Sequence, residues 1–233
     1  MAGLVSAYGL APGVAGSLNA LLGLLSDPAA PTAVHDPPRA ADVHVADSLV
    51  ALEVPDVRTA ARIADLGAGA GLPGLVLAIA LPASDVVLVE SAGRKCAFIE
   101  HAIEALRLDN ARVVRARVEQ WAEGMGTCDV VCARALGALP VLCEYAAPLL
   151  REGGMLVAWK GLVEATEEAD GGAAAEILGL APAGVLPVLP YASSERRTLH
   201  LFRKVTPTPL GYPRRPGFAK KRPLSTDIRR PRR

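Results

Sequence analysis

The ten residues from Asp65 to Gly74 (Asp-Leu-Gly-Ala-Gly-Ala-Gly-Leu-Pro-Gly) constrain the fold of this chain more than any other segment. An apolar run over 62–66 leads into them and a second run over 75–81 follows, which predicts a strand, a tight turn and a helix. Alternate glycines let a ligand approach the backbone where a Cβ would clash. Free N–H groups at the helix start suit a polar or anionic ligand. A tight turn without a ligand is the alternative, and three glycines that each lower stability disfavour it.

A second apolar strand is predicted over 85–89, and it ends at the carboxylate of Glu90. A carboxylate in this place accepts hydrogen bonds from both hydroxyls of a ribose. A surface ion pair with Arg94 is the alternative for Glu90, and its position at a strand end favours ribose binding. The glycine-rich turn and the acidic second strand together predict a cofactor that contains a nucleoside.

Two classes of cofactor fit this turn. The pattern Gly69-x-Gly71-x-x-Gly74 also matches the dinucleotide fingerprint, which is a weak signal on its own. Asp65 disfavours a dinucleotide, because its carboxylate would repel a pyrophosphate but attract the ammonium group of S-adenosylmethionine. Pro73 removes an N–H group that a phosphate would use. We therefore favour S-adenosylmethionine over NAD or FAD.

The other apolar runs alternate between strand and helix patterns. Helices are expected around 14–26, 42–52, 92–106 and 164–178, strands at 112–116, 129–133 and 155–159 with a turn at 151–154, and a closing hairpin from 184–189 and 198–204. A hydrophobic content of 51% with only 4% aromatic residues is typical of an α/β core. The order predicts a Rossmann-like class I S-adenosylmethionine methyltransferase fold, with a mostly parallel seven-stranded sheet and an antiparallel edge hairpin.

Three parts are expected along the chain. They are a helical N-terminal extension (1–57), the methyltransferase domain (58–205) and a basic, proline-rich, flexible C-terminal tail (206–233). No stretch reaches the roughly 18–20 apolar residues that span a bilayer, so we expect a cytoplasmic protein that binds no membrane. A monomer is also expected. The cysteines form no Cys-x-x-Cys pair and have no histidine at ligand spacing, so no metal site is predicted; they are Cys96, Cys128, Cys132 and Cys143.

Positive charge is concentrated at the C-terminus. Residues 214–233 contain nine basic side chains and one acid, a net charge of +8, whereas residues 1–213 carry −7. The basic residues are Arg214, Arg215, Lys220, Lys221, Arg222, Arg229, Arg230, Arg232 and Arg233, and the acid is Asp227. A tail this basic favours a nucleic-acid partner. A disordered tail that aids solubility is the alternative.

The segment Asp65–Gly74 resembles the cofactor loop of the ribosomal RNA small subunit methyltransferase G family, also called glucose-inhibited division protein B. Further segments agree with the family in order and spacing: His44–Leu49, Glu90–Phe98, Arg117–Glu119, Asp129–Ala135 and Trp159–Gly161. The resemblance runs from about residue 40 to 204, and the Leu-Pro-Gly ending of the loop is its most diagnostic part. The first 35 residues and the basic tail lie outside it.

The resemblance implies methyl transfer from S-adenosylmethionine to N7 of one guanine in 16S rRNA, near the decoding centre of the small ribosomal subunit. Guanine N7 carries a lone pair and no proton, so no general base is needed and no catalytic residue is expected. The sequence Ala133-Arg-Ala-Leu136 after the predicted fourth strand lacks the Asn/Asp-Pro-Pro-Tyr motif of amino methylation. A methyltransferase with another substrate and an inactive RNA-binding assembly factor are the alternatives; the intact loop disfavours the second.

Their positions make nine residues the expected cofactor contacts, and for the last of them the resemblance implies the same role: Asp65, Gly67, Gly69, Gly71, Leu72, Glu90, Val118, Glu119 and Arg134. Val118 and Glu119 are expected beside the adenine ring, although Glu119 alternatively serves as a charge at a helix start. Arg134 is expected where the cofactor carboxylate and the target base meet, and with Lys160 it is suspected of positioning the substrate.

Basic residues near the carboxyl ends of the strands and in the tail are expected to bind RNA. They are Arg94, Lys95, Lys160, Arg214, Arg215, Lys220 and Lys221. Lys160 is the best single candidate, because it ends an otherwise apolar strand. A solvated helix start is an equally good interpretation of Arg94 and Lys95.

Overall fold

The computed structural model describes residues 1–226, which form two compact units. The first contains residues 1–116 and 189–195, and the second contains 117–188 and 196–226. Five charged residues of the predicted basic tail lie outside the described part: Asp227, Arg229, Arg230, Arg232 and Arg233. The three-part division at 57 and 205 stays a prediction.

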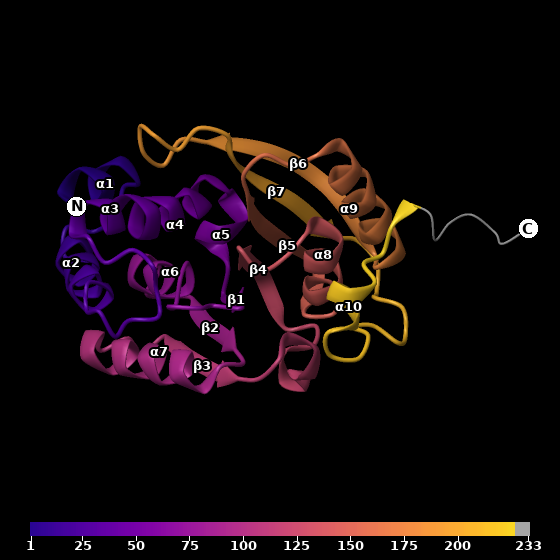
Figure 1. The fold of residues 1–233 in the computed structure, drawn as a ribbon, viewed down its shortest axis with the longest axis horizontal. Helices are drawn as coiled ribbons and strands as arrows, with labels where there is room; N and C mark the ends of the chain where they lie inside the picture. The colour runs from indigo at the N-terminus through magenta and orange to yellow at the C-terminus, as the bar shows by residue number, and fades with distance from the viewer. Residues whose placement is uncertain (227–233) are drawn as a thin grey trace, which may run out of the picture. The chain divides into compact units, whose positions relative to one another are not determined.

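A parallel sheet of three strands, in the order β3-β2-β1, forms the centre of the first unit (Figure 1). The strands are β1 (Arg62–Leu66), β2 (Asp85–Glu90) and β3 (Ala111–Arg115). Ile63, Leu66 and Leu88 are fully buried, as expected for apolar strands covered on both faces. The register aligns Leu66 with Val89, so the carboxyl ends of β1 and β2 lie next to each other.

Helices make up the rest of the regular structure of the first unit. They are α1 (Ala2–Ala7), α2 (Val14–Leu25), α3 (Pro37–Ala40), α4 (Asp47–Leu49), α5 (Pro55–Thr59), α6 (Gly74–Ala80) and α7 (Gly93–Leu106), with a π-helix at Ala41–Ala46 and a 3₁₀-helix at Val50–Glu53. Every residue of α6 is buried, because it is apolar on all sides and α2 packs against it (Figure 1). This packing fixes the helix that follows the glycine-rich turn.

The second unit contains a mixed sheet in the order β4-β5-β7-β6. Its strands are β4 (Cys128–Arg134), β5 (Leu150–Lys160), β6 (Leu180–Val188) and β7 (Arg197–Lys204), and its helices are α8 (Leu139–Ala146), α9 (Ala165–Ile177) and α10 (Phe218–Lys221), with 3₁₀ turns at Val118–Gln120 and Ala122–Gly124. β4 and β5 are parallel, whereas β7 is antiparallel to both β5 and β6 (Figure 1). The predicted antiparallel hairpin is therefore confirmed.

Two details differ from the prediction. The sequence indicated no helix between the fourth and fifth strands, where α8 lies; its residues are all buried, so it shows no amphipathic period. The predicted turn at 151–154 belongs to the start of β5, where Gly153 has a positive φ of 81° and the pairing with β4 shifts register. No helix within residues 1–226 is long and apolar enough to cross a membrane.

The segment after β7 is also better packed than predicted. Residues 205–226 include α10, and Ala219 and Leu224 are 1% and 2% exposed. Part of the predicted tail is therefore packed on the second unit, and its flexibility stays a prediction. The physical reason for the packing is a set of carboxylates on the second unit that bind this segment.

Candidate cofactor site

The turn after β1 has the backbone conformation that its glycines predict. Gly67, Gly69 and Gly71 have positive φ angles of 64°, 62° and 84°, where a side chain would be strained. The N–H groups of Gly67 and Ala68 donate to the carbonyl of Val89, at 2.8 and 3.2 Å. The turn is thus fastened to the end of β2.

The glycines of the turn serve different purposes. A Cβ on Gly71 would overlap the side chain of Leu75, and a Cβ on Gly74 would lie 2.7 Å from Leu88. These two residues are small because the turn and α6 pack tightly. A Cβ on Gly69 would meet only the carbonyl oxygen of Gly67, at 3.8 Å. Open space above Gly69 fits the close backbone approach of a ligand such as S-adenosylmethionine.

Asp65 lies beneath the turn and is 1% exposed. Its Oδ2 accepts a hydrogen bond of 2.8 Å from the N–H of Gly74, the first residue of α6. The carboxylate therefore fixes the helix start and adds negative charge next to the turn. Its expected role toward the cofactor ammonium stays a prediction. Leu72, also expected at the cofactor, is 6% exposed.

Glu90 connects the end of β2 to the centre of the turn. Its Oε2 accepts from the N–H of Gly69 at 3.0 Å, and its Oε1 accepts from Ser91 and Ala92, each at 2.8 Å. The nearby cation is Lys95, whose Nζ lies 4.0 Å from Oε2. Glu90 is thus close to Lys95, and the alternative ion pair with Arg94 is not formed among the described residues. Oε2 keeps acceptor capacity for a ligand hydroxyl.

Val118 and Glu119 lie in the second unit, in the 3₁₀ turn at Val118–Gln120. Val118 is 7% exposed. The Oε1 of Glu119 accepts from the N–H of Gly217 at 2.8 Å. Burial, together with the charge of Glu119 and a hydrogen bond to it, raises the pKa of the Tyr145 hydroxyl. Glu119 therefore binds the N–H of Gly217 and the hydroxyl of Tyr145, both in its own unit. The sequence alone did not predict either contact.

Lys160, which is expected to bind RNA, forms an ion pair within the second unit, and its role toward RNA stays a prediction. Its Nζ lies 2.6 Å from Oε1 of Glu167 and donates to the carbonyl of Gly137 at 3.3 Å. The same Oε1 accepts from the N–H of Leu139 at 3.0 Å. Burial would raise the pKa of Glu167, but the hydrogen bonds from Lys160 and Leu139 outweigh it and hold that pKa below its usual range.

This ion pair anchors the loop that follows β4. The loop begins after Arg134, which is half-buried at the end of the strand, and its first residue Ala135 has a positive φ of 54°. Lys160 and Glu167 bind the other end of the loop, at Gly137 and Leu139. Lys160 thus helps to position the loop that follows Arg134.

We expect Lys160→Met and Glu167→Gln each to slow methyl transfer about fivefold, in line with the roughly 1 kcal/mol of one such hydrogen bond. Because both changes break the same anchor, the double variant should lose no more than the more damaging single variant. Single-turnover rates of the three variants and the wild type measure this coupling. Losses that multiply in the double variant would instead mean that Lys160 contacts the substrate independently.

The model of the rRNA small subunit methyltransferase G family (GidB) matches residues 21–188. The chain belongs to this family. Among the relatives that carry the family name, the protein of Rubrobacter xylanophilus is 47% identical over 187 residues, which cover 78% of this chain and 72% of the relative. That of Deinococcus radiodurans is 40% identical and covers 78% and 73%. The resemblance stated from the loop motif is confirmed.

Solved structures give the fold class. A predicted O-methyltransferase from Agrobacterium tumefaciens aligns with a TM-score of 0.54 at 23% identity, over 71% of this chain and 81% of that one. The antibiotic-resistance methyltransferase Kmr has a TM-score of 0.54 at 21% identity, covering 67% and 92%. At these identities the likeness concerns the fold alone. The predicted α/β Rossmann-like class I methyltransferase fold is confirmed.

Proposed function

We propose that this chain transfers a methyl group from S-adenosylmethionine to N7 of one guanine in 16S rRNA, near the decoding centre of the small ribosomal subunit. Membership of the rRNA small subunit methyltransferase G family supports an rRNA substrate and this methyl donor. Ribosomal subunits are cytoplasmic, so the proposal includes a cytoplasmic protein. We keep the expectation that it acts as a monomer.

One observation carries the proposal: the turn in which three glycines have positive φ and a Cβ on Gly69 would meet open space. S-adenosylmethionine supplies an activated methyl group on a sulfonium. The turn lets the methionine portion approach the backbone, and Glu90 offers an acceptor for ribose hydroxyls at the end of β2. Asp65 supplies negative charge for the ammonium group.

Three further assignments concern residues of the second unit. We assign Val118 and Glu119 to the adenine ring and Arg134 to the cofactor carboxylate and the target base. For Glu119 the assignment requires that its carboxylate, or the backbone beside it, serves the adenine while Gly217 and Tyr145 are bound. Arg134 is supported by its place at the carboxyl end of β4, where ligands bind in this class of fold.

The proposed chemistry asks the protein only to align the reactants and exclude water. Guanine N7 presents an in-plane lone pair without a proton, so a general base would have nothing to remove. Rate enhancement then comes from holding N7 in line with the methyl group and the sulfur. A cation near the base serves to hold guanine O6 or a phosphate. Arg134 is our candidate for this role.

We assign RNA contacts to basic side chains that are exposed and not held in a close ion pair. Arg94 is exposed and Lys95 partly exposed at the start of α7, so both remain proposed contacts. Lys160 and Arg214 are held by carboxylates, and we propose that both position other segments.

The deciding experiment is transfer of a labelled methyl group to small ribosomal subunits that lack native modification, followed by mapping of the labelled base. We expect label at N7 of a single guanine near the decoding centre. Naked 16S rRNA is the second substrate to assay. Failure to label either substrate, with cofactor binding confirmed by calorimetry, would refute the proposed substrate and leave the fold untouched.

A further inference from the structure

The segment 211–226, which we call the strap, is held on the second unit by three carboxylates. Arg214 binds Glu144 of α8, the N–H of Gly217 binds Glu119, and Thr226 binds Asp170 of α9. The anchored positions are spread over the length of the strap. The strap lies outside residues 21–188, which the family model matches.

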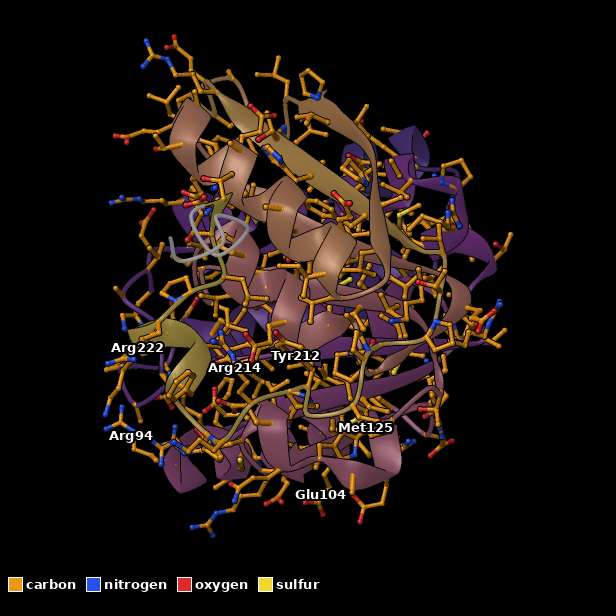
Figure 2. All side chains as sticks on the ribbon, turned by 90° about the vertical axis from the view of Figure 1, so that its right-hand side faces the viewer. Arg94, Glu104, Met125, Tyr212, Arg214 and Arg222 are labelled. Carbon is orange, nitrogen blue, oxygen red and sulfur yellow. The ribbon has the colours of Figure 1, made fainter. Side chains whose placement is uncertain are left out.

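The strongest anchor is the pair of Arg214 with Glu144, which is 0% exposed. The Nε of Arg214 lies 2.9 and 3.0 Å from the two carboxylate oxygens, Nη2 lies 2.5 Å from Oε2, and the backbone N–H donates at 3.0 Å. Nη2 also donates to the carbonyl of Arg222, and the guanidinium lies 5.9 Å from the centre of the Tyr212 ring (Figure 2). The carboxylate of Glu144 therefore neutralises the charge of Arg214.

The second anchor fixes the turn into α10. Gly217 has a positive φ of 76°, and its N–H donates to Glu119 at 2.8 Å. The ring of Phe218 lies between two guanidinium groups, 4.9 Å from that of Arg214 and 5.3 Å from that of Arg215. Such cation–π contacts hold both side chains in place. The strap is therefore ordered around its basic residues.

Four basic side chains remain exposed on the strap: Arg215, Lys220, Lys221 and Arg222. Residues 205–226 contain no acid, so nothing within the segment neutralises them. Ala219 and Leu224 are the buried side of the strap, at 1% and 2% exposure. The inward side thus anchors the strap, and the four cations form an outward-facing basic surface.

We propose that these four strap cations bind backbone phosphates of the rRNA substrate. The proposal rests on the proposed function, because that function supplies a polyanionic substrate. Because the anchors already hold the backbone that carries these cations, the strap loses less conformational freedom on binding than a free tail would, which favours affinity. Contacts to phosphates add affinity and orientation without reading a sequence. The strap therefore holds the substrate, and selection of the target guanine lies elsewhere.

The test compares two variants of equal net charge. The strap variant carries Arg215→Gln, Lys220→Gln and Lys221→Gln, and the control carries Arg39→Gln, Arg107→Gln and Arg196→Gln, which removes three exposed cations from other places. Affinity for unmethylated small subunits is measured between about 50 and 200 mM salt, where phosphate contacts are weakened. Thermal unfolding verifies that both variants fold, and cofactor affinity verifies an unchanged turn.

We expect the strap variant to bind small subunits roughly tenfold more weakly at low salt, and the slope of log K against log salt to fall by about two to three. Its KM for subunits should rise while kcat stays near that of the wild type. The control should behave like the wild type. Equal losses in both variants would mean that only net charge matters and would overturn the proposal.

Two further outcomes would overturn it. If the wild type methylates subunits and the strap variant keeps its affinity and salt slope, the surface is wrong and the proposed function stands. If the strap variant loses only binding to phosphatidylserine vesicles, the partner is a lipid surface and not RNA. If the wild type neither binds nor methylates subunits, the proposed function is wrong, and the inference about the strap is wrong as well.

Discussion

Replacing Gly69 with glutamate is expected to raise the dissociation constant for S-adenosylmethionine by about a hundredfold or more, about 2.7 kcal/mol of binding free energy. The new side chain would occupy the open space above the turn and place a second carboxylate beside Glu90, which binds the N–H of Gly69. The φ of 62° adds backbone strain of about 1–2 kcal/mol. Calorimetric titration with S-adenosylmethionine measures the change directly.

Backbone strain needs a control of its own, and Gly126→Glu provides it. Gly126 has a φ of 66° and no atom within 4 Å of its Cβ position, so the substitution brings the same strain and charge away from the turn. We expect Gly126→Glu to lose stability as Gly69→Glu does but to keep cofactor affinity. Equal loss of affinity in both variants would show that strain, and not occupation of the turn, is responsible.

The glycine-rich turn was predictable because its signal is local. Consecutive residues determine the strand, the positive φ angles and the helix start, and no distant partner is needed. Sequence alone also identified Glu90 at the end of the second strand. Its hydrogen bonds from the N–H groups of Ser91 and Ala92 are local, whereas the bond from Gly69 depends on the register of β1 and β2 and was not predictable.

Lys160 was interpreted as an RNA contact because a lysine at the end of an apolar strand has no visible partner in the sequence. Its partner Glu167 lies on α9, and their meeting depends on how that helix packs. A charged residue finds its counterion through the fold. A position at the end of a strand therefore predicts that a residue lies near a functional site, but it does not predict what its side chain does there.

The docking of the strap likewise depends on the fold, although the sequence contained one sign of it. Prolines and arginines predicted a poorly packed tail, yet α8 reads Leu-Pro-Val-Leu-Cys-Glu-Tyr-Ala, with a single acid, Glu144, among mostly apolar residues. A carboxylate buried in such a helix requires a cation from elsewhere in the chain. The arginine-rich C-terminus was a candidate source. Which arginine reaches it depends on the path of the chain after β7.

Replacing Arg214 with methionine is expected to lower the free energy of unfolding by about 3–5 kcal/mol, because it leaves the fully buried Glu144 charged and unpaired. Urea unfolding followed by circular dichroism measures the loss. Arg151→Met is the matched control: Arg151 pairs with Asp129 but its side chain is 56% exposed, so the loss should stay within about 1 kcal/mol.

A second substitution separates the buried charge from lost packing. Adding Glu144→Gln to Arg214→Met removes the unpaired charge and keeps an acceptor for the backbone N–H of residue 214. The double variant should therefore regain much of the stability that the single variant loses. An Arg214→Met variant as stable as Arg151→Met would mean that the strap is not docked in solution. Because the strap cations depend on this anchor for their fixed positions, that result would also remove the physical basis for a preformed phosphate-binding surface.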